Sequence, residues 1–381
     1  MHIERLYADG FRNLDTVELY PQPRFNVLTG DNGQGKTNIL EAIWLLSGLR
    51  SFRTRKLTEC VHFDKDTAEL AARVRRMDSA SDVGLRLAPR RNTVFIDGKQ
   101  QARGRDFLGR LVAVLFIADD LRLPHAEPAK RRRYLDRALW THDRAYVKTL
   151  RDFEKALAQR NGLLKNHIGR GIDPGMLEVF DDMVSVTGAA VALCREQFVA
   201  AFSLQVQQQL SAFGAAGMSC GLRYDSKYGG GVDDVDARKA LLAEGLLAKR
   251  DVDRRRGFTS VGPHHDDMTL LVNERPARLH ASQGQCRALV LAMKIAELRS
   301  LEQAHGEAPL LLMDDVSSEL DKTRNAALMH HLDALGGQVF LTTTDAAHIL
   351  VTAPTAIFDV AGGRAAARKT EPVVATRADL H

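Results

Sequence analysis

The sequence predicts an α/β fold in which a mixed sheet, flanked by helices, is built from both ends of the chain around an inserted helical hairpin. Three observations support this prediction. An apolar strand pattern over 25–29 runs through a glycine-rich turn into a helical pattern over 38–49. Residues 129–168 and 176–213 are helical in pattern and contain no proline. From residue 257 onward, strand and helix patterns alternate again.

The first section of the chain reads as a strand-rich lobe. Apolar residues alternate with polar ones at the start of the chain and become continuous over 25–29, as expected for strands. Short alternating segments fill 68–114, and Asp97-Gly98 marks a tight hairpin turn among them. The helical pattern over 38–49 is the exception within this lobe.

The character of the sequence changes near Pro124 and Pro128. The two helical stretches that follow are separated by 169–175, a segment with glycines and a proline that stops a helix. Two helices joined by so tight a break imply an antiparallel hairpin. Adding a helix at 235–249, we predict a helical arm domain over 124–256.

The last section returns to the α/β pattern. Strands are expected at 268–272, 310–313 and 338–341, and helices at 285–301 and 319–335. Residues 1–123 and 257–360 are therefore predicted to form one head domain. Residues 361–381 are rich in alanine, arginine and threonine without periodicity, and we expect them to be a disordered tail.

Composition narrows the class of protein. Hydrophobic residues make up 45% of the chain and charged residues 27%, as in ordinary globular proteins. We expect neither a membrane span nor a signal peptide, because the apolar runs are short. The four cysteines include no CxxC pair, which argues against a zinc site and a disulfide framework. The expected location is the cytoplasm.

A glycine-rich segment predicts a nucleotide site. It matches GxxxxGK[ST] without mismatch and lies between the expected strand and helix. Its backbone N–H groups would cradle phosphates, Lys36 would reach the β- and γ-phosphates, and Thr37 would ligate Mg²⁺. A chance glycine-rich turn is the alternative, and the flanking elements argue against it. The expected ATP contacts are Gly30, Asp31, Asn32, Gly33, Gln34, Gly35, Lys36 and Thr37.

The apolar strand at 310–313 ends in two acids, as in a Walker B motif. A buried strand can deliver a carboxylate rigidly to a metal ion at its carboxyl end, so Asp314 is predicted to hold Mg²⁺. Asp315 stands where ABC-type ATPases usually place a glutamate that polarises the attacking water. Because its side chain is one methylene shorter, we expect slow hydrolysis. A strand ending in a surface acid pair is the alternative.

A second phosphate-binding device is predicted before the helix at 285–301. Ser282 and Gly284 stand at its N-terminus, where a hydroxyl, backbone N–H groups and the helix dipole all favour negative charge. The order, with this segment before the Walker B strand, is that of an ABC signature. Asp321 belongs to a following segment, 317–321, that looks like a D-loop. Alternatively, Ser282 only caps its helix.

These motifs together resemble the ABC-type ATPases, their SMC-like members, and among these the RecF family. The matching segments are 3–6 with 10–14, 33–43, 51–53, 132–136, 262–267, 282–285 and 314–321. They follow the family's order and span about residues 1–360. The chain departs from the family pattern at His265, where an arginine is usual, and at Cys286, where a glutamine is common. Any role of that arginine is therefore not carried over.

The resemblance implies a mechanism. Two subunits sandwich two ATP molecules, and Ser282 reaches the γ-phosphate held by the other subunit, so the chain is expected to form an ATP-dependent homodimer. Thr344 stands where transporter ATPases carry a switch histidine, which implies γ-phosphate sensing by a hydroxyl. Arg12 is expected to lean over the phosphates. The implied activity is a weak, DNA-stimulated ATPase with Lys36, Asp315 and Thr344 as catalytic residues.

RecF resemblance also implies binding of double-stranded DNA near single-strand gaps, with assistance to RecA loading together with RecR and RecO. Such binding would grip phosphates without reading bases. The basic runs that could do this are otherwise ordinary solvated surface. The candidate DNA contacts are Arg53, Arg55, Lys56, Arg131, Arg132 and Arg133.

The sequence leaves two alternative interpretations. One is an energy-coupling ATPase subunit of another ABC or SMC-like complex. Three features argue against it: the long separation in sequence between Lys36 and Ser282, Thr344 in place of a histidine, and the short helical hairpin. The other is a metal site at 264–267. Adjacent residues on an extended segment point to opposite sides, which argues against shared ligation of one ion.

Overall fold

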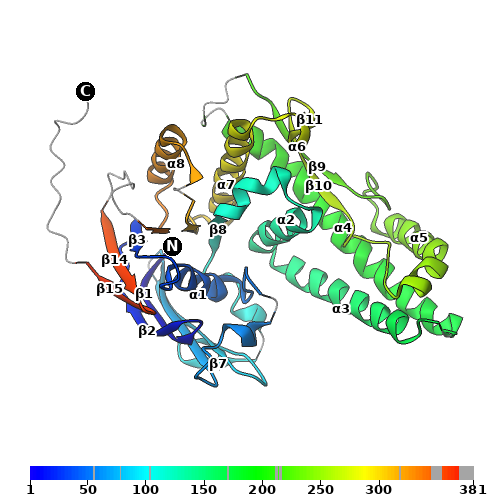
Figure 1. Cartoon of the computed structure of the whole chain (residues 1–381), viewed down its shortest axis with the longest axis horizontal. Helices are drawn as coiled ribbons and strands as arrows, with labels where there is room; N and C mark the ends of the chain where they lie inside the picture. Colours follow the sequence, from blue (N-terminus) through cyan, green and yellow to red (C-terminus); the bar gives the residue numbers. More distant parts are fainter. Residues whose placement is uncertain are drawn as a thin grey trace. The chain divides into compact units, whose positions relative to one another are not determined.

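The structure is a computed structural model of the chain. It describes residues 1–54, 56–77, 79–102, 104–169, 171–210, 213, 217–316, 319–344 and 354–368. The chain divides into two compact units, Met1–Ala118 with His305–His381, and Asp119–Ala304 (Figure 1). Each unit is described by itself.

The described part of the first unit contains an antiparallel sheet of order β2-β1-β4-β5-β6-β7. Buried residues alternate with residues that are mostly half-buried along its strands, as in a sheet with one face on the core. The predicted hairpin is confirmed, because Asp97 and Gly98 join two of the strands with φ of 49° and 73°. The strands are β1 (His2–Phe11), β2 (Leu14–Leu19), β4 (Ala68–Arg76), β5 (Ser79–Leu87), β6 (Thr93–Ile96) and β7 (Lys99–Gln101).

The second sheet of this unit, over the described residues, has the order β15-β14-β3-β13-β12-β8. Its strands from β14 to β8 run parallel to one another, and its central strands are buried almost throughout, as parallel strands are. Their carboxyl ends meet at one edge, where the predicted motifs follow. The strands are β3 (Phe25–Thr29), β8 (Ala113–Ile117), β12 (Leu310–Asp314), β13 (Val339–Thr343), β14 (Thr355–Ala361) and β15 (Arg364–Ala367).

Helix α1 (Lys36–Gly48) contacts strands of both sheets. This position explains why its apolar residues are not confined to one stripe, since a helix covered on several sides has no need of a polar face. Helix α8 (Lys322–Leu335) lies between β12 and β13 in sequence. Short 3₁₀ helices cover Leu57–Cys60 and Gly104–Asp106.

The prediction of a disordered tail over 361–381 is wrong for its first residues. Residues 361–368 complete a hairpin in which β15 pairs antiparallel with β14. Gly362 and Gly363 make the turn with φ of 54° and 75°, a backbone that favours glycine. Periodicity could not reveal this hairpin, because backbone bonds to β14 hold it rather than an apolar face. The remainder of the predicted tail, 369–381, lies outside the described residues.

The second unit is mainly helical. Helix α3 packs along α4, and Leu164, Ile172 and Leu177 form a small core at the turn between them, which gives the predicted antiparallel hairpin. Its elements are the 3₁₀ helix Ala118–His125, which begins one residue before the unit, α2 (Pro128–His142), α3 (Arg144–Asn166), α4 (Pro174–Leu210), β9 (Cys220–Asp225), α5 (Val235–Arg256), β10 (Asp267–Val272), β11 (Arg275–Pro276), α6 (Ala277–His280) and α7 (Gln283–His305).

The predicted domain boundaries need correction at residues 257–304, which belong to the second unit rather than to the head. Strand β10 pairs with β9. Fully buried Arg160 on α3 bonds Asp253 and the Thr259 hydroxyl, each at 2.8 Å. Arg195 on α4 donates to the Pro263 carbonyl at 2.7 Å. Buried charges need such partners, so these arginines tie the later segment to the helices.

Among the described helices, none combines the length and the apolar character needed to cross a bilayer.

Candidate nucleotide-binding site

The loop between β3 and α1 has the backbone of a phosphate cradle. Gly30, Gly33 and Gly35 have φ of 148°, 80° and 120°, values that L side chains rarely adopt. A Cβ on Gly30 would lie 2.2 Å from the Val360 carbonyl oxygen. The ammonium of buried Lys36 donates to the carbonyl of Gly30 and, at 2.8 Å, to that of Asp31. The lysine therefore already lies against the loop that it is predicted to serve.

Helix α1 begins in a way that suits an anion. Gly35 precedes it and has no side chain that could cap the first N–H groups. The first turn carries no acidic residue. The free N–H groups and the positive end of the helix dipole favour negative charge at this point. The residues present therefore fit the phosphates of a nucleotide.

Thr37 and Asp314 meet as the two motifs predict. The Thr37 hydroxyl lies 2.8 Å from Oδ1 and 3.0 Å from Oδ2 of Asp314. Burial raises the pKa of Asp314, and hydrogen bonds from Thr37 and Thr342 act against that rise. Hydroxyl and carboxylate oxygens are the ligands that Mg²⁺ prefers, so this pair would hold the ion of a Mg–ATP complex.

Asp315 follows directly on β12 in a left-handed conformation, with φ of 52°. Its side chain is exposed, and its backbone N–H donates to the Thr342 hydroxyl at 2.9 Å. A non-glycine residue in this region costs about 1 kcal/mol. The second acid therefore leaves the strand in a direction different from that of Asp314.

Comparisons with known proteins identify the family. The sequence model of the RecF/RecN/SMC N terminal domain family matches residues 2–361. The DNA replication and repair protein RecF of Myxococcus xanthus is 38% identical over 373 residues, which cover 97% of this chain and 98% of that protein. RecF of an Anaeromyxobacter species is 41% identical over 367 residues, covering 95% and 98%.

The chain belongs to the RecF family.

Solved structures show the same fold. The recombination mediator protein RecF in the RecFOR pathway, in a structure with ATPrS, matches with a TM-score of 0.86 and 30% identity over 96% of this chain and 98% of that one. An Smc head domain of Pyrococcus furiosus matches with a TM-score of 0.52 at 14% identity, a likeness of fold alone. The predicted fold class, an ABC-type ATPase head with a helical arm, is confirmed.

Gln34 of the phosphate loop contacts the turn between β14 and β15. Its side-chain oxygen accepts the N–H of Gly362 at 2.7 Å, and its carbonyl accepts the N–H of Gly363 at 3.1 Å. The side chain predicted to contact ATP thus fastens the loop to the β14–β15 turn. Sequence reasoning missed this contact because it placed the turn in a disordered tail.

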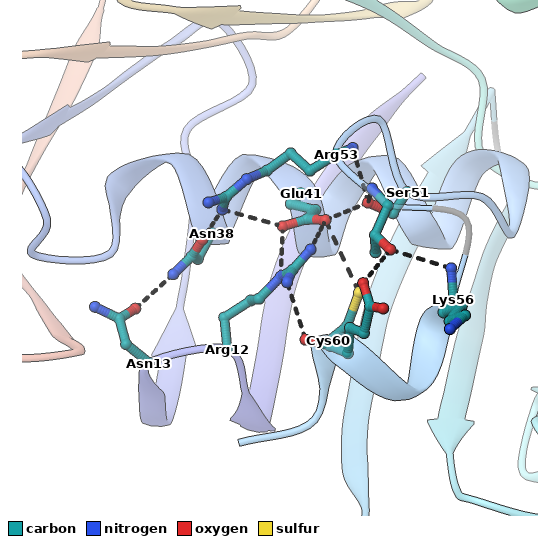
Figure 2. Close-up of polar contacts among 10 residues, drawn as sticks. Arg12, Asn13, Asn38, Glu41, Ser51, Arg53, Lys56 and Cys60 are labelled. Atoms are coloured by element: carbon teal, nitrogen blue, oxygen red, sulfur yellow. Dashed lines mark hydrogen bonds and ion pairs between the residues drawn. The ribbon is translucent and has the colours of Figure 1, made fainter. Parts of the chain in front are cut away.

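Arg12, expected to lean over the phosphates, binds a buried acid instead (Figure 2). Its Nε lies 2.9 Å from Oε2 of Glu41 and its second terminal nitrogen 2.7 Å from Oε1. Glu41 is fully buried on α1 and also accepts from Ser51. Burial and the neighbouring Glu41 raise the pKa of the Cys60 thiol to about 11. Arg12 is therefore a neutralising partner for Glu41 in this structure.

Arg53 connects to the phosphate loop through two amide side chains, as Figure 2 shows in part. Its guanidinium donates to Asn38 at 2.7 Å, Asn38 donates to Asn13 at 2.6 Å, and Asn13 donates to the Gly33 carbonyl at 2.9 Å. Its charge also opposes the effect of burial on the Asp314 pKa. Arg53 thus lies beside the nucleotide site, although it was predicted only as a DNA contact.

Two of the three predicted DNA contacts on α2 are buried or half-buried. Arg131 is 6% exposed and forms a bidentate ion pair with Asp267 at 2.8 and 2.6 Å. Arg132 is half-buried and donates to the Asp266 carbonyl at 2.6 Å. Neighbouring residues on a helix point in different directions. Because one side of α2 is buried, its unbroken basic run cannot face solvent throughout. Arg131 is withdrawn as a DNA contact, whereas Arg133 is exposed.

Two other predicted basic contacts, Arg55 and Lys56, follow the first helix in the sequence. Lys56 is exposed, and Arg55 lies outside the described residues. The predicted switch residue, Thr344, follows β13 and is exposed. Ser317 and Ser318 of the predicted D-loop also lie outside the described residues.

The signature serine caps its helix, as the alternative interpretation holds. Its hydroxyl accepts the N–H of Gln285 at 3.2 Å, while the Gln285 side chain accepts the Ser282 N–H at 2.8 Å, a reciprocal capping arrangement. Ser282 is exposed and Gly284 lies in the first turn of α7. Capping and phosphate binding use the same helix end, so neither interpretation excludes the other. Asp321 likewise caps α8, accepting the N–H of Arg324 at 2.9 Å.

Proposed function

We propose that the chain is an ATP-dependent DNA-binding switch in DNA replication and repair. The observation that carries this proposal is the preassembled contact of Thr37 with Asp314 beneath an uncapped helix N-terminus. Lys36 and the loop N–H groups would hold the phosphates, and Thr37 and Asp314 would hold Mg²⁺. Bound Mg²⁺ would neutralise charge between the β- and γ-phosphates.

The switch would work as a homodimer. Ser282 is exposed at the start of α7, where a hydroxyl and a helix dipole suit the γ-phosphate of a nucleotide held by a second copy. ATP would then join two subunits across a two-fold interface. Asp315, exposed next to Asp314 in the chain, would polarise the attacking water, and hydrolysis would be slow because its side chain is short. Thr344 would sense the γ-phosphate. Hydrolysis would release the dimer.

DNA would be held through its phosphates. Arg53, Lys56 and Arg133 are the predicted contacts that are exposed, and binding through such side chains is independent of sequence and sensitive to salt. Joining two weak surfaces in an ATP-bound dimer would strengthen binding without new contacts. The proposed setting is double-stranded DNA near single-strand gaps, where the chain would assist RecA loading with RecR and RecO.

The test measures binding to a gapped DNA duplex by fluorescence anisotropy with ATP, ADP or no nucleotide, alongside ATP turnover. We expect ATP to strengthen DNA binding at least about 10-fold and turnover to stay below about 10 s⁻¹. Faster turnover without a nucleotide effect on DNA binding would contradict the switch.

Paired variants locate the DNA surface. Replacing Lys56 and Arg133 by alanine should lower the slope of log affinity against log salt by about 2. Arg86→Ala, which removes an exposed arginine paired with Glu69, is the matched control and should leave the slope unchanged. Equal slopes in the wild type, the double variant and Arg86→Ala would show that Lys56 and Arg133 do not contact DNA.

A further inference from the structure

Thr342 lies at the centre of the parallel sheet, between the strand that enters the phosphate loop and the strand that carries the Walker B acids. It belongs to β13, which pairs with β3 on one side and β12 on the other. Its side chain is buried, at 2% exposure. The predicted switch residue, Thr344, lies two residues further along the chain and is exposed.

The Thr342 hydroxyl serves both acids. It donates to Oδ1 of Asp314 at 2.9 Å, and it accepts the backbone N–H of Asp315, also at 2.9 Å. A hydroxyl has one proton to donate and lone pairs to accept, so a single group can make both bonds at once. Valine has the shape of threonine but could make neither bond.

Each bond constrains one part of the proposed reaction. The bond to Oδ1 fixes the rotation of the Asp314 carboxylate while the Thr37 hydroxyl touches both of its oxygens. The bond from the Asp315 N–H helps to hold a residue whose φ is 52°, a conformation that is otherwise unfavourable for aspartate. The first bond fixes the orientation of Asp314, the proposed metal ligand. The second fixes the direction of the Asp315 side chain, which is proposed to polarise the attacking water.

We propose that Thr342 is a positioning residue for ATP hydrolysis, which orients the Asp314 carboxylate toward Mg²⁺ and holds the backbone of Asp315. The proposal rests on the proposed function for the reaction itself. It differs from the γ-phosphate sensing expected of Thr344, because Thr342 acts through its bonds to the two acids.

The experiment compares the full-length wild type with Thr342→Val and Thr342→Ser. Three quantities are measured: ATP turnover against Mg²⁺ concentration, affinity for a fluorescent ATP analogue with Mg²⁺ or with EDTA, and the midpoint of thermal unfolding. Loss of a group that orients a metal ligand typically costs about 10- to 100-fold in metal affinity or activity. We expect Thr342→Val to lower kcat and to raise the Mg²⁺ requirement by about that factor.

Two further results are expected. Affinity for the analogue in EDTA should stay within about 2-fold of wild type, because the phosphate loop is untouched. Thr342→Ser, which keeps the hydroxyl, should restore kcat and the Mg²⁺ requirement to within about 3-fold. Wild-type Mg²⁺ dependence in Thr342→Val would overturn the proposal, and so would equal defects in the valine and serine variants. Loss of affinity in EDTA together with a lower unfolding midpoint would indicate a structural role and would also overturn it.

These outcomes are separable from failure of the proposed function. A wild-type chain that bound Mg–ATP without hydrolysing it would contradict the proposed reset by hydrolysis. The Mg²⁺ dependence of analogue binding would still test Thr342, because it reports the orientation of Asp314 without turnover.

Discussion

Glu41 on α1 is a buried charge near the nucleotide site, and its ion pair with Arg12 contributes to the stability of the chain. It has no exposed surface, and Arg12 supplies two of its hydrogen bonds. Removing one partner of a buried ion pair leaves the other without compensation and costs about 3–5 kcal/mol. The Arg12 side chain is 16% exposed, so water relieves part of that cost.

We therefore expect Glu41→Gln to lower the free energy of unfolding by about 2–3 kcal/mol, measured by urea denaturation. Glu18→Gln is the matched control, because Glu18 pairs with Arg5 on the surface at 40% and 50% exposure. Exposed pairs contribute about 0–1 kcal/mol. Equal, small losses in the two variants would show that the pair of Arg12 and Glu41 does not stabilise the chain.

His264 makes stability depend on pH. Burial lowers its pKa from 6.5 to about 4, so the folded chain holds the neutral ring while the unfolded chain accepts a proton. A depressed histidine pKa contributes stability above pH 6.5, and this contribution is lost as the pH falls toward 4. We expect a loss of about 2 kcal/mol between pH 7.5 and pH 5 from this residue.

The measurement is the free energy of unfolding at both pH values for wild type, His264→Gln and His280→Gln. The first variant should lose less stability on acidification than wild type, and the second, at an exposed histidine elsewhere in the unit, should behave like wild type. Identical pH dependence in wild type and His264→Gln would contradict the assignment.

Among the elements, the hairpin of β14 and β15 contacts the phosphate loop directly. Its turn binds Gln34 through the N–H groups of Gly362 and Gly363. A Cβ on Gly363 would lie 2.0 Å from the Asn13 carbonyl oxygen, whereas a Cβ on Gly362 would meet no atom within 4 Å. Both glycines have positive φ, so the two positions differ in contact and not in backbone strain.

Gly363→Ala should displace the turn from Gln34 and weaken ATP binding by about 10-fold, roughly the 1.4 kcal/mol of one hydrogen bond. Gly362→Ala costs the left-handed strain of about 1 kcal/mol in stability but should keep ATP affinity. Affinity for a fluorescent ATP analogue distinguishes them. Equal affinities in the two variants would mean that the hairpin does not position the loop.

The elements also show what sequence can and cannot predict. The phosphate loop and the Walker B strand were predictable, because each is a local pattern of glycines or apolar residues with fixed neighbours. Strands β8 and β9 were not predicted, since their pairing with distant segments leaves only short local signals. The prediction that Arg131 on α2 contacts DNA was wrong, because a run of like charges does not reveal which side of a helix is buried.

The contact of Thr342 with both acids was beyond prediction for a related reason. Three consecutive threonines carry the same chemistry in the sequence, and only the strand order β3-β13-β12 brings the first of them to Asp314. The pairing of Thr37 with Asp314 follows from two local motifs, whereas the side chain that orients Asp314 depends on the order of strands in the sheet.

At the scale of the whole molecule, the proposed switch depends on nucleotide-dependent assembly. The first unit, from the two ends of the chain, carries Lys36 and Asp314, and the second unit carries Ser282. If Ser282 serves the nucleotide of another copy, each site is complete only in a dimer. The mass of the particle in solution should therefore depend on ATP.

Sedimentation velocity with ATP and Mg²⁺, with ADP, and without nucleotide tests this claim most directly. We predict a dimer with ATP and a monomer under the other two conditions. Lys36→Arg and Ser282→Arg should remain monomeric with ATP, and Ser282→Arg should still bind the nucleotide. The same mass under all three conditions, or normal ATP-dependent dimerisation of Lys36→Arg, would contradict the account.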